Sequence, residues 1–119
     1  MSTVAKRRRV GLTLTRRVKQ QVLEAAAAQH VSAGDWVLRA AAVHAGALQE
    51  ALDPLEVRSR PRVEDAVFTA LELTPEEQAH LDNLAVACGL NRSAFASSVS
   101  RLALGEEMQA VLAPLVEPG

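Results

Sequence analysis

The sequence predicts a mainly α-helical protein in which two strand-helix-helix units share one short, two-stranded antiparallel β-ribbon. Residues 9–15 alternate between apolar and other side chains, as a half-buried strand does, and two amphipathic helical patterns follow them. The same succession returns when the sequence is shifted by 59 residues, so that Thr15 falls on Thr74. One unit cannot bury its own apolar face, because isolated strands are marginal without partners. The two units are therefore expected to fold together.

The first strand is expected to present two different faces. Its apolar side chains would face a core, and they are Val10, Leu12 and Leu14. Its other face would hold Arg9, Gly11 and Thr13. A guanidinium, a bare backbone position and a hydroxyl can approach base edges closely, and Arg is the usual reader of guanine in the major groove. The alternative is an ordinary edge strand with a solvated polar face.

Two helices should follow this strand. Thr15 is placed to cap the first, over residues 16–29, and Ser32 to cap the second, which would end at Gly46. His30 interrupts the helical pattern between them. The side chains expected to face inward are Val18, Val22, Ala25 and Ala26 in the first helix and Trp36, Val37, Ala40 and Val43 in the second.

The second unit carries the same signals in a stronger form. Residues 74–77, Thr-Pro-Glu-Glu, form a capping box with proline at the first helical position. Gly89 lies where the chain must turn in a left-handed conformation, and His30 occupies that place in the first unit. Further equivalent pairs are Leu12 and Leu71, Leu14 and Leu73, Val22 and Leu81, Ala26 and Ala85, Val31 and Leu90, Ser32 and Asn91, Trp36 and Phe95, and Gly46 and Gly105.

These patterns divide the chain into five segments. They are a basic N-terminal arm at 1–8, the first unit at 9–46, a linker at 47–65, the second unit at 66–105 and a short amphipathic tail at 106–119. Pro54 and Pro61 break any continuous helix in the linker, so only a short helical extension to about Leu52 is expected there. The tail residues expected to cover the chain's own core are Met108, Val111, Leu112 and Leu115.

The net charge of the chain is −1, but its positive and negative side chains are distributed very unevenly along the sequence. Residues 1–19 hold seven basic and no acidic side chains, whereas the other 100 residues hold six basic and fourteen acidic ones. A phosphate backbone would attract the seven, which are Lys6, Arg7, Arg8, Arg9, Arg16, Arg17 and Lys19. A targeting signal or membrane-surface arm is the alternative for residues 6–9, although no amphipathic apolar face lies beside them.

Composition argues against several other classes of protein. Cys88 is the only cysteine, so no intrachain disulfide is expected and the cytoplasm, a reducing compartment, is the natural location. No apolar run approaches the roughly 20 residues of a membrane span. The side chains with catalytic or metal-binding chemistry are His30, His44, His80 and Cys88. They show neither metal-ligand spacing nor a nucleophile elbow, so no catalytic residue, metal or cofactor is expected.

The whole pattern resembles the ribbon-helix-helix family of DNA-binding proteins over residues 9–46 and 68–105. The matching features are the alternating strands, the capping threonines, the turns at 30–32 and 89–91, and the closing glycines. The resemblance implies that the two strands pair into an antiparallel ribbon that enters the major groove of double-stranded DNA.

The resemblance also implies which residues contact DNA. The base-reading positions fall on Arg9, Gly11, Thr13, Phe68, Ala70 and Glu72. The residues expected at phosphates are Ser32, Ala33, Asn91 and Arg92, through backbone amides that open helices, and Lys6, Arg7, Arg8, Arg16 and Arg17, through their side chains. Glu72 would repel phosphate but could accept a hydrogen bond from cytosine, and Phe68 could meet a thymine methyl. Either the DNA site is asymmetric, or the second unit mainly completes the fold.

Antiparallel pairing of the two strands within one chain would place Gly11 opposite Ala70 and Arg9 opposite Glu72. Opposite charges facing each other favour this register by roughly 0.2 to 1 kcal/mol. Pairing of first strands from two chains would instead bring two strongly basic segments together. An intramolecular pseudo-dimer is therefore expected, and higher assemblies on DNA remain open.

Two units in one chain resemble the tandem ribbon-helix-helix accessory proteins of conjugative plasmids. This resemblance implies binding near the transfer origin in a relaxosome, with a relaxase or another protein of that complex as partner, and a role in transcription regulation. The alternative is a transcriptional repressor or an antitoxin that binds a protein partner. Toxin-binding tails are usually longer than the fourteen residues after Gly105, and residues 47–65 are the other candidate surface.

Overall fold

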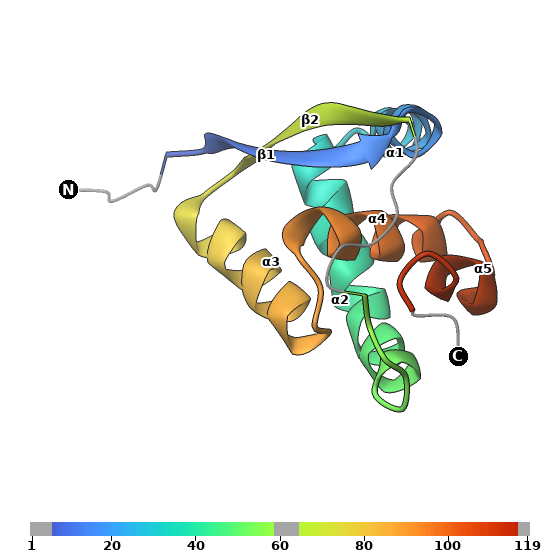
Figure 1. Cartoon of the computed structure of the whole chain (residues 1–119). Coiled ribbons are helices and arrows are strands. Elements are labelled where there is room, and N and C mark those ends of the chain that lie inside the picture. The colour runs from blue at the N-terminus through green and yellow to red at the C-terminus, as the bar shows by residue number, and fades with distance from the viewer. Residues whose placement is uncertain (1–5, 59–64, 117–119) are drawn as a thin grey trace.

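The computed structural model describes residues 6–58 and 65–116, and Figure 1 shows a two-stranded ribbon lying over a body of helices. In chain order the elements are β1 (Arg8–Thr15), α1 (Arg16–Ala28), α2 (Ala33–Leu52), β2 (Ala66–Leu73), α3 (Pro75–Ala87), α4 (Arg92–Ala103) and α5 (Met108–Leu112). The chain is mainly helical, and strand, helix and helix follow one another twice. Residues 1–5 of the predicted arm, 59–64 of the linker and 117–119 of the tail lie outside the described residues.

The two strands pair antiparallel along their whole length, in the register that the sequence predicted. Gly11 lies opposite Ala70, and Arg9 lies opposite Glu72. The undersides of the strands are buried, with no more than 4 % exposure at Val10, Leu12, Leu14, Thr69, Leu71 and Leu73. Because side chains alternate across a strand, the residues between these positions lie on the outer face of the ribbon.

Helix starts recur at the predicted spacing of 59 residues. α1 begins at Arg16 and α3 at Pro75, each directly after a capping threonine. Thr74 completes the predicted capping box, because the amide of Glu77 donates to Thr74 Oγ1 at 3.1 Å and the amide of Thr74 donates to Glu77 Oε1 at 2.8 Å. Such caps satisfy N–H groups that no bond within the helix can reach, which fixes where each helix starts.

Both units turn between their helices through a residue in the left-handed conformation. The φ angle is 57° at His30 and 72° at Gly89, which confirms the prediction for both positions. In each turn the next amide, of Val31 or Leu90, donates to the helix carbonyl five residues earlier, at 3.0 and 2.9 Å. His30 therefore has a structural role at this turn.

The predicted helix end at Gly46 is wrong, because α2 continues unbroken through Gly46 to Leu52. The helical extension expected to about Leu52 is confirmed, and it belongs to the same helix. Leu48 and Leu52 are 0 % and 3 % exposed, and their packing outweighs the roughly 1 kcal/mol that a helical glycine costs. The inward orientation predicted for Val43 is wrong, since this residue is 72 % exposed. Val43 lies about 200° around the helix from Ala41, which is fully buried, and so faces the opposite side.

α2 and α4 pack against each other beneath the ribbon and form the centre of the molecule (Figure 1). The predicted inward positions Trp36 and Phe95 lie in this core, at 6 % and 0 % exposure. Val111 and Leu115 are buried too, so the tail covers the chain's own core as predicted. Arg58 fastens the tail, because its amide and its Nε each donate to a tail carbonyl at 2.8 Å.

Two glycines of α2 should respond to alanine in opposite ways. A Cβ at Gly34 would lie 2.8 Å from the carbonyl oxygen of Glu72, because α2 packs closely against β2. The backbone of a paired strand cannot move aside without losing hydrogen bonds or packing, so Gly34→Ala should lower the free energy of unfolding by about 1 kcal/mol or more. Gly46 has no atom within 4 Å of such a Cβ, so Gly46→Ala should raise this free energy by about 0.5 to 1 kcal/mol. Urea unfolding followed by circular dichroism measures both, and equal effects would contradict the close contact.

Candidate nucleic-acid interface

The six residues predicted to read bases lie together on the outer face of the ribbon. They are Arg9, Gly11 and Thr13 from β1 and Phe68, Ala70 and Glu72 from β2. Five of them are exposed and Ala70 is half-buried, so none of the described helices covers this face. The two strands differ in chemistry: β1 contributes a guanidinium, bare backbone and a hydroxyl, whereas β2 contributes an aromatic ring, a methyl and a carboxylate.

Arg9 is the exposed cation of this face. Glu72 lies directly across the ribbon from Arg9. Arg9 and Lys6 nevertheless form no ion pair and no side-chain hydrogen bond with the residues that the structure describes. The guanidinium of Arg9 therefore keeps its donors directed to solvent, where a ligand can reach them.

The ring of Phe68 lies across Gly11 on the same face. A Cβ at Gly11 would be 2.8 Å from Phe68 Cε2 and 3.1 Å from Phe68 Cζ. Since Gly11 is not directly opposite Phe68 in the register, the ring leans along the ribbon to a diagonal neighbour. Lys19 Nζ donates to the backbone oxygen of Phe68 at 3.0 Å and holds this strand edge from α1. Phe68 remains 65 % exposed, whereas Trp36 and Phe95 are buried.

Basic side chains at the start of β1 make only exposed contacts. Arg7 Nη1 lies 3.5 Å from Asp35 Oδ1. Arg8 Nε donates to Gln78 Oε1 at 3.2 Å. Exposed contacts of this kind contribute little to stability, since solvent screens them and long side chains must be ordered to make them. Arg7 and Arg8 can therefore exchange these partners for phosphates at little cost.

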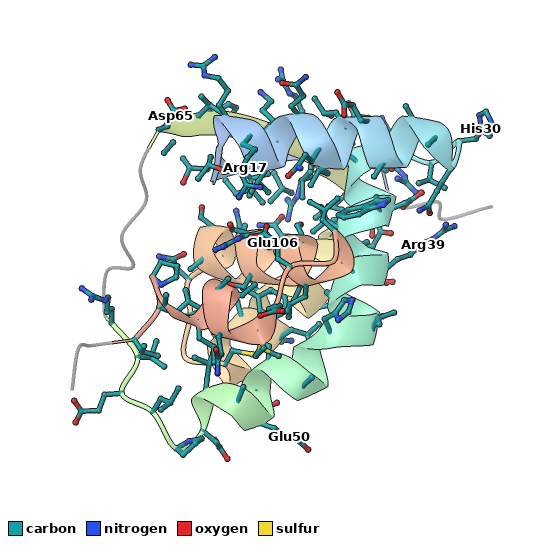
Figure 2. All side chains as sticks on the ribbon, turned by 90° about the vertical axis from the view of Figure 1, so that its right-hand side faces the viewer. Arg17, His30, Arg39, Glu50, Asp65 and Glu106 are labelled. Carbon is teal, nitrogen blue, oxygen red and sulfur yellow. The ribbon has the colours of Figure 1, made fainter. Side chains whose placement is uncertain are left out.

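Two further basic side chains come from the first turn of α1. Arg16 pairs with Asp65 at 3.8 Å, directly before β2 begins. Arg17 pairs with Glu106 at 3.6 Å, and Figure 2 shows the Arg17 side chain directed toward Glu106, which lies in the turn after α4. This second pair joins the first unit to the end of the second.

The second helix of each unit begins with a side-chain cap, as predicted. Ser32 Oγ accepts from the amide of Asp35 at 3.1 Å, and Asn91 Oδ1 accepts from the amide of Ala94 at 2.8 Å. Each cap uses the amide of the third helical residue, so the first two N–H groups of each helix have no partner within the helix. The predicted phosphate clamps lie at these two helix openings.

The start of α4 is hydrogen-bonded to the edge of β1. Ser93 Oγ accepts from the amide of Thr13 at 2.9 Å, and Arg92 Nη1 donates to the carbonyl of Gly11 at 3.1 Å. Arg92 also forms a bidentate pair with Asp82, at 2.7 and 2.8 Å. Because the guanidinium of Arg92 is engaged within the protein, the phosphate contact predicted there would come from its backbone amide.

Ion pairs lower the pKa of two carboxyl groups. The hydrogen bond from Arg92 lowers the pKa of Asp82 below its ordinary value of 3.8 and outweighs the effect of burial. The hydrogen bond from Arg101, supported by the charges of Arg101 and Arg17, lowers the pKa of Glu106 below its ordinary value of 4.5. Both carboxylates are therefore ionised at neutral pH, where they tie α4 to α3 and to α1.

Stability should decrease as acid protonates these carboxylates. Because the folded pKa of Asp82 lies below the unfolded one, its contribution is complete above the unfolded value and is lost as the pH falls through the folded value. Asp82→Asn should be less stable than the native chain near neutral pH, and the difference should close in acid. Urea midpoints measured between about pH 7 and pH 3 test this. A difference that does not change with pH would show that the Asp82 charge is not its source.

Sequence reasoning did not identify Ser93, Asp82 or Lys19 as partners of the ribbon or of its phosphate-binding positions. Arg92 and Asp82 are ten residues apart, a spacing that matches no helical period, and only the turn at Gly89 brings them together. The sequence indicated Lys19 as a positive charge near the ribbon. Nothing in the sequence indicated its hydrogen bond to the carbonyl of Phe68.

The remaining reactive side chains do not gather into a second site. Cys88 is buried at the end of α3, and burial raises the pKa of its thiol. Within residues 6–58 and 65–116, no three His, Cys, Asp or Glu side chains lie where they could hold a metal ion. None of the helices in these ranges is long and apolar enough to cross a membrane.

Comparison with known proteins returned no match: no protein-family model, no curated protein and no solved structure corresponds to this chain. A function for the ribbon must therefore be inferred from the chain's own residues and geometry.

Proposed function

We propose that this chain binds double-stranded DNA sequence-specifically, as a single-chain ribbon-helix-helix pseudo-dimer that inserts the outer face of its ribbon into the major groove. The observation that carries the proposal is that Arg9, Gly11 and Thr13 lie exposed side by side on that face, in the most basic part of the chain. A ribbon of two strands about 4.8 Å apart fits a major groove about 12 Å wide.

Three residues of β1 would read bases by different chemistry. The guanidinium of Arg9 can donate two hydrogen bonds to the O6 and N7 atoms of guanine. The hydroxyl of Thr13 can donate to or accept from a base edge, and Gly11 lets the strand backbone approach the base pairs. Arg9 and Thr13 are exposed, so base contact by these two side chains needs no rearrangement of the described fold, whereas backbone approach at Gly11 requires the ring of Phe68 to turn aside.

Flanking groups would position the ribbon on the phosphates. The side chains of Lys6 and Arg7 precede the ribbon, Arg8, predicted to lie in the N-terminal arm, is the first residue of β1, and Arg16 and Arg17 follow this strand. In their ion pairs, the side chains of Arg7, Arg16 and Arg17 are 45 %, 71 % and 60 % exposed. Solvent screens such pairs, so a phosphate can replace the carboxylate partner.

The helix openings would set the register on the duplex. The residues involved are Ser32 and Ala33 at α2 and Asn91 and Arg92 at α4. Backbone N–H groups at a helix N-terminus attract anions because they have no partner within the helix and because the helix dipole is positive there.

The biological role proposed is that of a cytoplasmic accessory protein of plasmid conjugation, without catalytic activity, that binds at the transfer origin beside a relaxase and also regulates transcription. Support comes from the succession of two units in one chain, since single-chain tandem units are what those accessory proteins have. A transcriptional repressor is the second candidate. An antitoxin role is less favoured because the tail packs onto the chain's own core, where Val111 and Leu115 are 0 % and 3 % exposed.

Selection of bound fragments from a random duplex pool and from the native replicon, followed by footprinting, tests the proposal. We expect one discrete site to be enriched at moderate salt. A site beside a nick site would support the conjugation role, and a site over the chain's own promoter would support repression. Arg39→Ala, which removes an exposed charge from α2, is the control and should leave selection unchanged. Absence of enrichment would overturn sequence-specific DNA binding.

A further inference from the structure

Phe68 is the one large apolar side chain on the outer face of the ribbon. It is 65 % exposed, and the other exposed large apolar residues within 6–58 and 65–116 lie outside the strands; they are Leu23, Val43, Leu55 and Val86. Phe68 does not extend freely into solvent, because its ring lies over Gly11, with Cε2 only 2.8 Å from the position a Cβ would take. The hydrogen bond from Lys19 fixes the backbone beneath the ring at 3.0 Å.

The ring, Gly11 and Ala70 form an apolar patch in the middle of the ribbon, and Thr13, opposite Phe68, lies on the side away from Arg9 and Glu72. Gly11 pairs with Ala70 in the middle of the ribbon, and Arg9 and Glu72 form the polar pair at one end. Any alanine-sized side chain at Gly11 would push the ring away, so the absence of a side chain there positions it. Gly11 therefore positions the ring, which takes the space that close backbone approach would otherwise use.

We propose that Phe68, positioned by Gly11, reads the C5-methyl group of a thymine at the centre of the bound site, an inference that rests on the proposed DNA binding. The thymine methyl is the apolar group that base pairs present in the major groove, and an aromatic side chain is a suitable contact for it. Arg9 would read guanine at one end while the second strand reads thymine. The second unit then contributes specificity, and the preferred site is asymmetric.

A competing explanation is that the ring only covers the glycine and stabilises strand pairing. The two explanations differ in one observable quantity. A structural role predicts no dependence of affinity on a single methyl group of the DNA, whereas a reading role predicts such a dependence and its loss when the ring is removed.

The test uses the enriched duplex with each thymine replaced, one at a time, by deoxyuridine, which removes only the methyl group. Affinities are measured for the native chain and for Phe68→Ala, Gly11→Ala and the control Val86→Ala, whose position on α3 is 75 % exposed. For the native chain, one replacement should weaken binding about fourfold, equivalent to ~0.8 kcal/mol for one buried methyl-sized group. Val86→Ala should retain this response.

Phe68→Ala should bind the thymine and deoxyuridine duplexes with equal affinity. For Gly11→Ala, the ratio of the affinity for the thymine duplex to that for the deoxyuridine duplex should be smaller than for the native chain. The thermal unfolding of Gly11→Ala should stay close to that of the native chain. A native response absent at every thymine, a selected site without thymine, or an unchanged ratio in Phe68→Ala would overturn the inference while leaving DNA binding intact. If the native chain enriches no duplex at all, the proposed function fails and the inference fails with it.

Discussion

Replacing Phe95 with alanine is expected to lower the free energy of unfolding by about 3 to 5 kcal/mol. The Phe95 side chain is 0 % exposed in α4, where it fills the centre of the core beneath the ribbon. Its removal loses both the transfer free energy of the ring and the contacts around the cavity that remains. Since small domains are stable by about 5 to 15 kcal/mol in total, a large part of the stability should be lost.

Urea unfolding of Phe95→Ala, followed by circular dichroism, measures this loss. Phe68→Ala is the matched control, because the same side chain is removed from a position that is 65 % exposed. The control should change the free energy of unfolding by less than about 1 kcal/mol. Similar losses in the two variants would contradict the assignment of Phe95 to the core and Phe68 to the surface.

Replacing Arg9 with alanine is expected to weaken binding to the preferred duplex by about 1 to 3 kcal/mol, which is a factor of roughly 5 to 150. Arg9 is exposed on the outer face and forms no ion pair within residues 6–58 and 65–116, so the substitution should leave the fold unchanged. Binding to unrelated duplexes should weaken much less. The base contact of Arg9 is expected only on the preferred duplex, so unrelated duplexes lose only the attraction of one positive charge. Titration of both duplexes at several salt concentrations measures the effect.

Arg7→Ala provides the comparison, since it removes an equal charge from a residue that we propose binds phosphate. It should weaken binding to all duplexes similarly and reduce the slope of log affinity against log salt by about one. If the two variants behaved alike on preferred and unrelated duplexes, the division into base-reading and phosphate-binding residues would be wrong.

Much of this protein's local structure is encoded in short stretches of sequence. The caps at Thr15 and Thr74 and the left-handed turns at His30 and Gly89 follow from local hydrogen bonding and backbone sterics, so they were predictable. The alternation of side chains in each strand determined its buried face, and the repeat at a constant spacing indicated that the strands belong together. The register was predicted from the opposite charges of Arg9 and Glu72, and a shift by one residue would in addition expose the apolar face.

Other features depend on what lies nearby in space. Gly46 does not end the helix, because the burial of Leu48 and Leu52 joins the extension expected to about Leu52 to the rest of α2. A glycine is a weak stop signal when packing holds the following turns in place. Of the side chains predicted to face inward in this helix, Trp36, Val37 and Ala40 are buried and Val43 is exposed.

The candidate site divides in the same way. Its six outward positions were predictable, because strand alternation is local and the register is set by burial of the other face. Two features of the site were not predictable, because they join residues from different elements. They are the position of the Phe68 ring over Gly11 and the hydrogen bonds of Arg92 to Asp82 and Gly11. The sequence by itself therefore determined which residues face outward, through the two-residue period of a strand. Only the tertiary structure decided which of them remain open to a ligand, because that depends on the partners that folding brings within hydrogen-bonding distance.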